Sequence, residues 1–138
     1  MLTHLFDTSV YSQPLRPLPH QAVMLRWRLL GDEKAAISAL CEGEVLFGIR
    51  LKGSARLREA YDRLLRGRLE MLPVDGEVVA VFAELKTDAV KRGRPISDMD
   101  LLIAATAKAH HLIVATLNVK HFATLEGVAV EDWSMPLS

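Results

Sequence analysis

Short apolar segments alternate with longer segments of helical periodicity along this chain, and this alternation most restricts the folds open to it. We expect strands at residues 2–6, 35–38, 69–74, 112–115 and 128–130. The fourth of these, Leu-Ile-Val-Ala, is apolar throughout, which is typical of a strand buried on both faces of a parallel sheet. Strands that alternate with helices form such sheets, with helices on both sides. The sequence therefore predicts an α/β fold: a three-layer α/β/α arrangement with a central parallel sheet.

The segments between these strands carry signals that begin and end helices. We expect helices at residues 20–30, 39–52, 54–66, 75–92 and 97–110. Ser54 and Ser97 are expected N-caps, because a serine hydroxyl accepts a hydrogen bond from a free backbone N–H of the first turn. Gly53 is expected to end the second of these helices.

The composition predicts one domain with a sizeable core. The chain has 138 residues, half of them hydrophobic, so we expect residues 1–138 to form a single domain. Lys and Arg together number 17, and so do Asp and Glu. This balance argues against nucleic-acid binding through bulk electrostatics, although a local basic rim around an acidic centre is compatible with it.

Other classes of protein are not indicated. Cys41 is the one cysteine, so an intramolecular disulfide is excluded. No apolar segment is long enough to span a membrane, and the N-terminus lacks the pattern of a signal peptide. We therefore expect a cytoplasmic protein. The chain has no Cys-x-x-Cys motif, glycine-rich phosphate loop or nucleophile elbow.

Three acidic residues lie beside or within strongly apolar segments. Asp7 follows the first expected strand, Glu44 lies in an apolar arc of the helix 39–52, and Asp100 opens an apolar helix. Glu42 lies in a weaker apolar arc and ranks behind Glu44. A buried, unpaired carboxylate is costly, and hard divalent cations prefer carboxylate oxygens. The three acids are therefore typical of a metal-dependent phosphodiesterase site.

Each acid also has a purely structural interpretation. Asp7 would bond the turn that follows it, as aspartate often does. Glu44 would pair with a cation such as Arg50. Asp100 stands three residues after Ser97, which is the spacing of a capping box.

The expected topology brings two of the polar candidates to one edge of the sheet. Ligands of parallel sheets bind at the carboxyl ends of the strands, where the strand order reverses. Asp7 comes just after the first expected strand, and Asn118 comes just after the fourth. We therefore expect both near one crevice.

A series of short motifs extends in order along almost the whole chain. They are Phe6-Asp7-Thr8-Ser9, Ile37-Ser38-Ala39 with Glu44 and Gly48, the segment from Asp100 to Ala107, the segment from Ala115 to Phe122, and Glu126-Gly127 leading to Asp132-Trp133. Together they resemble the PIN domain of VapC-type toxins. The resemblance implies a Rossmann-like fold and an Mg²⁺- or Mn²⁺-dependent endoribonuclease of a type II toxin–antitoxin system. It also implies a VapB-type antitoxin as partner, an RNA substrate and a homodimer.

By this resemblance, Asp7, Glu44 and Asp100 match the metal-site acids of the family, whereas Asp98 matches a position that is only sometimes acidic. We expect Asp7 and Asp100 to hold the ion, and Glu44 to bind it directly or through water. The ion would lower the pKa of a water molecule and neutralise charge on the scissile phosphate.

The segment from Ala115 to Phe122 departs from the family pattern at two positions. Asn118 stands where many PIN domains have a further acid, and His121 stands where an acidic or polar residue is usual. Both departures weaken the case for a second metal ion. We expect Asn118 and Thr116 to orient water or phosphate, and Arg94 and Lys120 to contact single-stranded or looped RNA at the rim.

Two other functions fit the same residues. One is a PIN-like module that binds RNA or protein without cutting, which the neutral Asn118 keeps open. The other is a nuclease of RNA maturation outside any toxin–antitoxin system, which would use the same site. A small antitoxin gene directly upstream would separate the toxin from the maturation nuclease.

Overall fold

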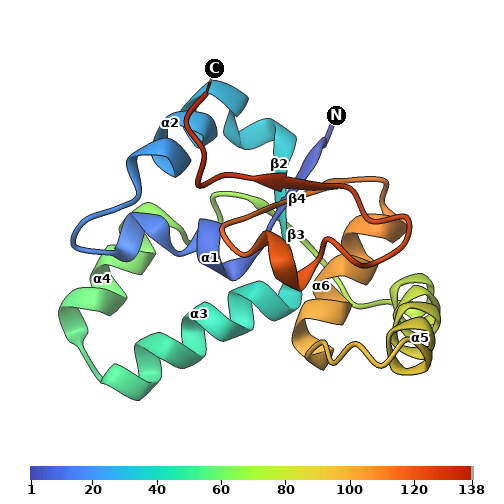
Figure 1. Ribbon diagram of the computed structural model, residues 1–138. Coiled ribbons are helices and arrows are strands. Elements are labelled where there is room, and N and C mark those ends of the chain that lie inside the picture. Colours follow the sequence, from blue (N-terminus) through green and yellow to red (C-terminus); the bar gives the residue numbers. More distant parts are fainter. Residues whose placement is uncertain (138) are drawn as a thin grey trace.

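A five-stranded, all-parallel sheet forms the centre of the molecule (Figure 1). The computed structural model describes residues 1–137. Its strands are β1 (His4–Phe6), β2 (Ala35–Ser38), β3 (Glu70–Leu72), β4 (Ile113–Thr116) and β5 (Val130–Asp132). Its α-helices are α1 (Thr8–Tyr11), α2 (Gln21–Leu30), α3 (Ala39–Lys52), α4 (Ala55–Leu64), α5 (Gly76–Lys91) and α6 (Asp98–Ala109). Short 3₁₀ helices are η1 (Gln13–Leu15), η2 (Asp32–Lys34) and η3 (Val119–His121).

The strand order is β3-β2-β1-β4-β5, so the order reverses beside β1. The chain moves outward from β1 through β2 to β3, and later returns to place β4 on the other side of β1. The carboxyl ends of β1 and β4 therefore flank the point at which such sheets bind ligands.

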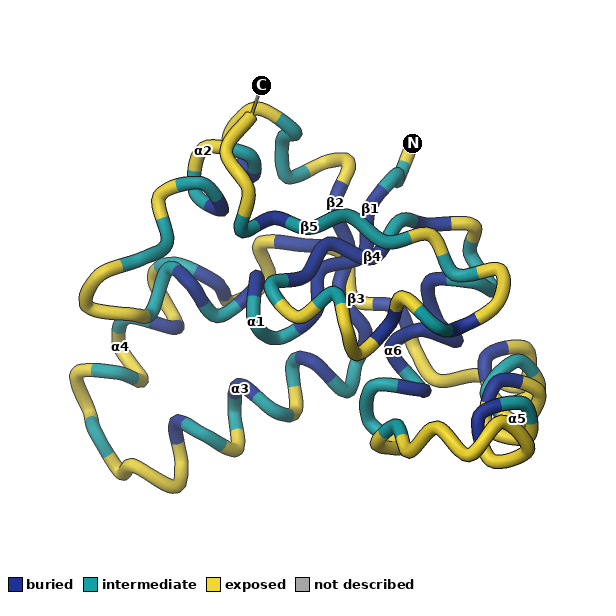
Figure 2. The backbone as a smooth tube through the Cα atoms, viewed as in Figure 1, coloured by how far each residue is buried: buried dark blue, intermediate teal, exposed yellow. Residues whose placement is uncertain are grey.

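Side chains of alternate strand residues enter two separate cores, one on each face of the sheet. Phe6, Ile37 and Ala115 pack with apolar residues of α1 to α4. Leu5 and Val114, from the same strands, pack with residues of α5 and α6. Figure 2 shows the central strands β1, β2 and β4 buried between these two layers of helices. The three-layer α/β/α prediction is confirmed.

The expected helix boundaries hold where the sequence carries a capping signal. The hydroxyls of Ser54 and Ser97 accept backbone N–H bonds of α4 and α6 at 3.1 Å each. Gly53 adopts the left-handed conformation, with φ 61°, directly after α3. Glycine has no Cβ to clash in this conformation, which explains why the helix ends there.

The structure corrects the expectation at three places. The single-turn helix α1 was not expected. It begins at Thr8, directly after Asp7, whose carboxylate caps it. The last strand lies at 130–132 instead of 128–130, because pairing with β4 sets its register: Val130 faces Val114. The third strand is shorter than expected, at 70–72, and its first two residues are exposed at the edge of the sheet. Among residues 1–137, no helix has both the length and the apolar character needed to cross a bilayer.

Candidate active site

The Asp7 carboxylate is buried at the carboxyl end of β1, and both of its oxygens accept hydrogen bonds. Asp7 as a whole is only 5% exposed. One oxygen, Oδ1, accepts bonds from the Ser9 hydroxyl at 2.6 Å and from the Val10 backbone N–H at 3.2 Å. The other, Oδ2, accepts a bond from the Thr116 hydroxyl at 2.5 Å. The expected turn bond of Asp7 is therefore present, and it holds the carboxylate in one orientation.

The same two hydroxyls tie the end of β1 to the end of β4. The Ser9 hydroxyl accepts the backbone N–H of Leu117 at 3.0 Å. The Thr116 hydroxyl accepts the backbone N–H of Asn118 at 2.8 Å. Thr116 is fully buried. Its hydroxyl therefore positions Asp7, where we had expected it to orient water or phosphate.

Burial raises the pKa of Asp7, because a charged carboxylate loses solvation in the protein interior. The bonds from Ser9, Thr116 and Val10 act in the opposite direction, and the negative charge of Asp100 raises the pKa further. No cationic side chain pairs with Asp7 within residues 1–137. The site thus holds a buried acid that has no cationic partner, beside the negative charge of a second acid.

Glu44 lies on α3, half-buried, and its carboxylate accepts a short hydrogen bond from the Thr8 hydroxyl of α1. Thr8 directly follows Asp7, so Glu44 is held next to the end of β1. The fully buried Cys41 thiol lies within 3.5 Å of the Thr8 hydroxyl. Burial, together with the charges of Asp7 and Glu44, raises the pKa of Cys41 to about 12. Cys41 is therefore packing material between the acids and is not a nucleophile.

Glu42, which ranked behind Glu44, has a structural role. Its carboxylate accepts bonds from the Tyr11 hydroxyl at 3.2 Å and from the Tyr61 hydroxyl at 3.0 Å. These tyrosines belong to α1 and α4, so Glu42 joins three helices. Burial and the Glu42 charge both raise the pKa of Tyr11 and of Tyr61, which keeps both hydroxyls protonated as donors.

Asp100 lies in the first turn of α6, and its carboxylate contacts His121. The Ser97 hydroxyl accepts the Asp100 backbone N–H, so Ser97 caps the helix as expected. Within residues 1–137 the Asp100 carboxylate does not return a bond to Ser97, and the capping box is therefore only half formed. Instead, Oδ2 of Asp100 lies 3.0 Å from Nδ1 of His121. The Asp100 side chain is 25% exposed.

The other predicted residues lie at the surface. Asn118 and Lys120 are exposed at the carboxyl end of β4 and in η3. Arg94 is exposed and lines a cavity of about 290 Å³ beside α5. The side chains of these three residues form no hydrogen bond or ion pair with Asp7, Glu44 or Asp100.

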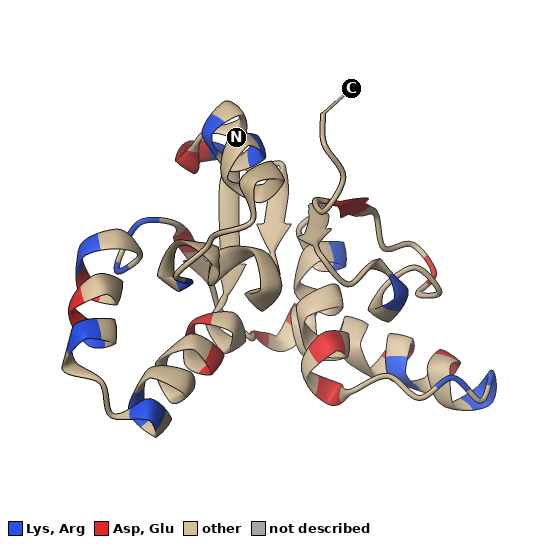
Figure 3. Ribbon diagram, turned by 60° about the vertical axis from the view of Figure 1, so that its left-hand side comes forward, with Lys and Arg blue, Asp and Glu red and all other residues tan. Residues whose placement is uncertain are grey.

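The acids gather at one edge of the sheet, but they do not form a closed cage. Figure 3 shows acidic segments at the start of α3 and of α6 on the side to which the strands point. In the described part of the chain, no three His, Cys, Asp or Glu side chains stand close enough to enclose a metal ion. Glu44 is turned toward Thr8, and Asp100 is turned toward His121.

Sequence reasoning predicted the turn bond of Asp7 but missed the other partners of the acids. Ser9 and Thr8 lie inside the Phe6-Asp7-Thr8-Ser9 motif, so adjacency to Asp7 was the available signal. The contact between His121 and Asp100 joins residues 21 positions apart in the sequence. No local pattern indicates such a pair.

Comparison with protein families matches residues 5–127 to the PIN domain. The chain belongs to the PIN-domain family. Among curated relatives of this PIN domain, the toxin FitB of Neisseria gonorrhoeae is 34% identical over 137 residues, covering 94% of this chain and 97% of FitB. The tRNA(fMet)-specific endonuclease VapC of Shigella flexneri is 25% identical, covering 97% of this chain and 100% of that protein.

Solved structures agree with this assignment. The crystal structure of FitAcB from Neisseria gonorrhoeae superposes with a TM-score of 0.87 at 32% identity, covering 95% of this PIN domain and 98% of that chain. A member of the VapBC family of toxin–antitoxin systems, VapBC-5 from Mycobacterium tuberculosis, gives a TM-score of 0.70 at 26% identity. The match covers 99% of this PIN domain and 100% of that chain.

Proposed function

We propose that this PIN domain is a metal-dependent endoribonuclease and the toxin of a VapBC-type toxin–antitoxin module in the cytoplasm. The observation that carries the proposal is Asp7: a buried carboxylate at the reversal point of the sheet, beside the negative charge of Asp100 and without a cationic partner in residues 1–137. Such a group gains most from a bound cation.

The donor set suits Mg²⁺ or Mn²⁺. Asp7, Asp100 and Glu44 offer carboxylate oxygens, which are the ligands that hard divalent cations prefer. A bound ion would lower the pKa of a water molecule and stabilise charge on the phosphate. Asp100 and Glu44 are the more exposed of the three acids, so their side chains are free to turn from His121 and Thr8 toward an ion beside Asp7.

The remaining residues orient the acids. Ser9 and Thr116 fix both oxygens of Asp7, and Thr8 holds Glu44 near it. A carboxylate fixed by bonds to rigid strand ends loses little conformational freedom when it binds a ligand. Asn118, exposed just after the carboxyl end of β4, would orient phosphate or water.

The relatives support the substrate and the partner. The Shigella flexneri relative is an endonuclease specific for tRNA(fMet), and VapBC-5 is a member of a toxin–antitoxin family. By analogy we propose RNA as the substrate and a VapB-type antitoxin as the partner. A homodimer remains a prediction, which light scattering of the purified protein tests.

The decisive experiment compares RNA cleavage by the wild type, Asp7→Asn and Asp98→Asn. Asp98 lies in the same first turn of α6 as Asp100, but it pairs with Lys86 at 2.9 Å, so its variant is a matched control. We expect cleavage with Mg²⁺ or Mn²⁺ by the wild type and by Asp98→Asn, and none by Asp7→Asn or with excess EDTA. Full activity in EDTA would rule out the metal-dependent reaction.

A second experiment separates the toxin from a maturation nuclease. Expression of the wild type alone should arrest growth of the host cells, and co-expression of the small protein encoded directly upstream should restore it. Normal growth of cells that make active enzyme would favour the maturation nuclease. Binding of RNA without any cleavage would favour the non-catalytic module.

A further inference from the structure

A cavity of about 350 Å³ opens beside Glu44, between the segment after α1 and the helices α3 and α4. Its polar lining consists of Thr8, Ser12, Arg16, Glu44 and Lys52. Thr8 and Glu44 are also part of the candidate active site. The cavity is therefore continuous with the place where the proposed cleavage occurs.

Two positive charges and one negative charge, that of Glu44, line this cavity. Arg16 and Lys52 are exposed, and neither forms an ion pair within residues 1–137. The chain as a whole has no formal net charge. Arg16 and Lys52 outnumber the Glu44 carboxylate, so the cavity has a local excess of positive charge that favours an anionic ligand, as basic grooves of single-strand-binding proteins do.

The rest of the lining suits the other parts of a nucleotide. Leu15 and Leu57 form an apolar wall on which a base can pack. The Ser12 hydroxyl makes no hydrogen bond within the described residues and is free to meet a ribose. Groups able to bind a phosphate, a base and a ribose hydroxyl therefore occur together in a space open to Glu44.

A glycine keeps this space open. Gly48 lies one helical turn after Glu44 and lines the cavity. A Cβ added at Gly48 would meet no atom within 4 Å, so no packing contact requires glycine there. A larger side chain at this position would project into the cavity without disturbing the core.

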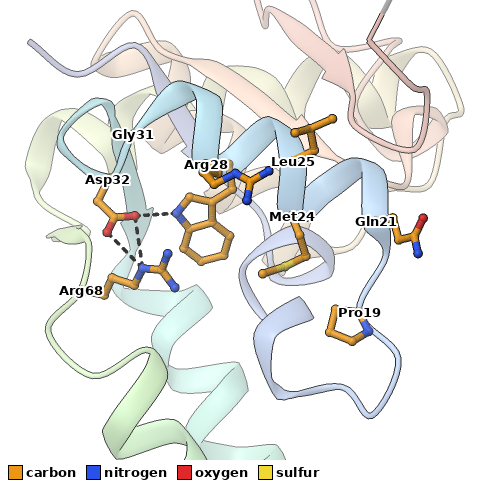
Figure 4. A pocket seen from close by; sticks show the side chains of 9 residues that line it. Pro19, Gln21, Met24, Leu25, Arg28, Gly31, Asp32 and Arg68 are labelled. Carbon is orange, nitrogen blue, oxygen red and sulfur yellow. Dashed lines mark hydrogen bonds and ion pairs between the residues drawn. The ribbon is translucent and has the colours of Figure 1, made fainter.

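Another cavity, of about 590 Å³, lies beside α2 (Figure 4). Its Arg68 and Trp27 side chains are already engaged, although Arg28 in the same lining forms no ion pair within residues 1–137. The Arg68 guanidinium lies 4.3 Å from the centre of the Trp27 ring and pairs with Asp32 at 3.1 Å. The Trp27 indole N–H donates to the same carboxylate. None of the three acids of the active site lines this cavity.

We propose that the cavity beside Glu44 holds a nucleotide of a single-stranded RNA next to the bond that is cut, with Arg16 and Lys52 bound to its phosphates. The inference rests on the proposed function, which it deepens by placing the RNA strand. A peptide segment of a partner protein is the rival occupant, and the continuity with the site acids favours RNA, because the strand must pass those acids to be cut.

The first test fills the cavity without changing any charge. Gly48→Leu is compared with Gly43→Leu, because both glycines lie inside α3 in open space but only Gly48 lines the cavity. Both variants carry Asp7→Asn, so that a short fluorescent single-stranded RNA binds without being cut. We expect Gly48→Leu to weaken binding by at least tenfold, and Gly43→Leu to leave it unchanged. Thermal melts of both variants confirm that each is folded.

The second test removes the charges. Arg16→Ala/Lys52→Ala is compared with Arg63→Ala/Lys91→Ala, which removes two exposed cations that lie outside the cavity and have no ion-pair partner within residues 1–137. Each phosphate contact adds about 0.7 to the slope of log affinity against log salt, so losing two contacts should reduce the slope by about 1.4. Relative to about 1 M salt, this change lowers the affinity at about 0.1 M salt by roughly 25-fold. The conservative Arg16→Lys/Lys52→Arg should keep most of the binding.

The outcomes separate this inference from the proposed function. If the wild type cuts no RNA, the proposed function is wrong, and the binding measurements still decide the role of the cavity. Equal RNA binding by Gly48→Leu and Gly43→Leu would overturn the inference even if the wild type cuts RNA. If Gly48→Leu loses binding to a fluorescent peptide of alternating Leu and Glu but binds RNA as Gly43→Leu does, the cavity is a peptide groove instead.

Discussion

Asp100→Asn distinguishes a metal ligand from a helix-capping residue. The substitution removes a negative charge but keeps the shape of the side chain. The cap of α6 depends on the Ser97 hydroxyl and the backbone N–H of residue 100, so it survives the change. Any effect of the substitution therefore comes from the contact with His121, from the helix dipole, from Asp7 or from a bound ion.

Without metal, these effects nearly cancel. The contact between Asp100 and the half-exposed His121 contributes about 0–1 kcal/mol at most, as exposed ion pairs do. The acid in the first turn of α6 contributes about 0.3–1 kcal/mol through the helix dipole. Relief of the repulsion with Asp7 acts in the other direction. We expect the metal-free melting temperature to change by no more than about 3 °C.

With metal, the difference becomes large. An ion present at about 100 times its dissociation constant stabilises the folded state by about 2.7 kcal/mol. At about 2.1 cal/mol/K per residue, unfolding of 138 residues has an entropy of about 290 cal/mol/K. The wild type should therefore melt about 9 °C higher at saturating Mn²⁺. A 100-fold loss of affinity in Asp100→Asn would reduce this rise to about 1 °C.

The assay is a set of thermal melts of the wild type, Asp100→Asn and Asp98→Asn, each with EDTA and with Mn²⁺. Asp98→Asn removes the same charge from the same turn of α6, so it should keep the wild-type shift. If Asp100→Asn shows the full Mn²⁺-induced rise, Asp100 supports the helix and is not a ligand.

Three further outcomes follow from the structure. Burial raises the folded-state pKa of Asp7 above its ordinary value of 3.8, so its contribution to metal-free stability is lost as the pH rises through that pKa. In urea unfolding with EDTA, the stability of Asp7→Asn relative to the wild type should therefore increase from pH 4 to pH 8, and a constant difference would contradict the buried charge. Glu42→Ala should destabilise the fold by about 1–3 kcal/mol, because the Tyr11 and Tyr61 hydroxyls both lose the carboxylate that accepts their bonds, while the folded variant still cuts RNA. Glu44→Ala should show the reverse, a loss of cleavage with little loss of stability, and equal behaviour of the two variants would refute these roles. The pKa of Cys41 is raised to about 12 by burial, so its thiol should react with Ellman's reagent only after unfolding, and rapid reaction of the native protein would show that the site between the acids is open.

The regular elements could be predicted where a local signal and the global pattern agree. Ala35–Ser38 and Ala39–Lys52 were predicted with their observed bounds, because a short apolar run marks the strand and Gly53 marks the end of the helix. The helix α1 was missed, since a single turn has too few residues for periodicity and depends on its cap, Asp7. The last strand was misplaced by two residues because its pairing with β4, and not its hydropathy, sets its position.

The amino-acid sequence by itself determined the fold class and the identities of the candidate acids. Alternation of strand-type and helix-type segments leaves few arrangements other than a parallel sheet covered on both faces. Asp7, Glu44 and Asp100 stand out because each interrupts an apolar pattern.

Only the tertiary structure decided what each acid contacts. Helical spacing places Glu42 and Glu44 on arcs of one helix, but it does not say that tyrosines meet one and Thr8 meets the other. The bond from Thr116 to Asp7 joins residues 109 positions apart, and the register between β1 and β4 makes it. Local sequence patterns are set by residues a few positions apart, whereas side-chain partners are set by how distant elements pack. The chemistry of the site therefore belongs to the fold as much as to the residues.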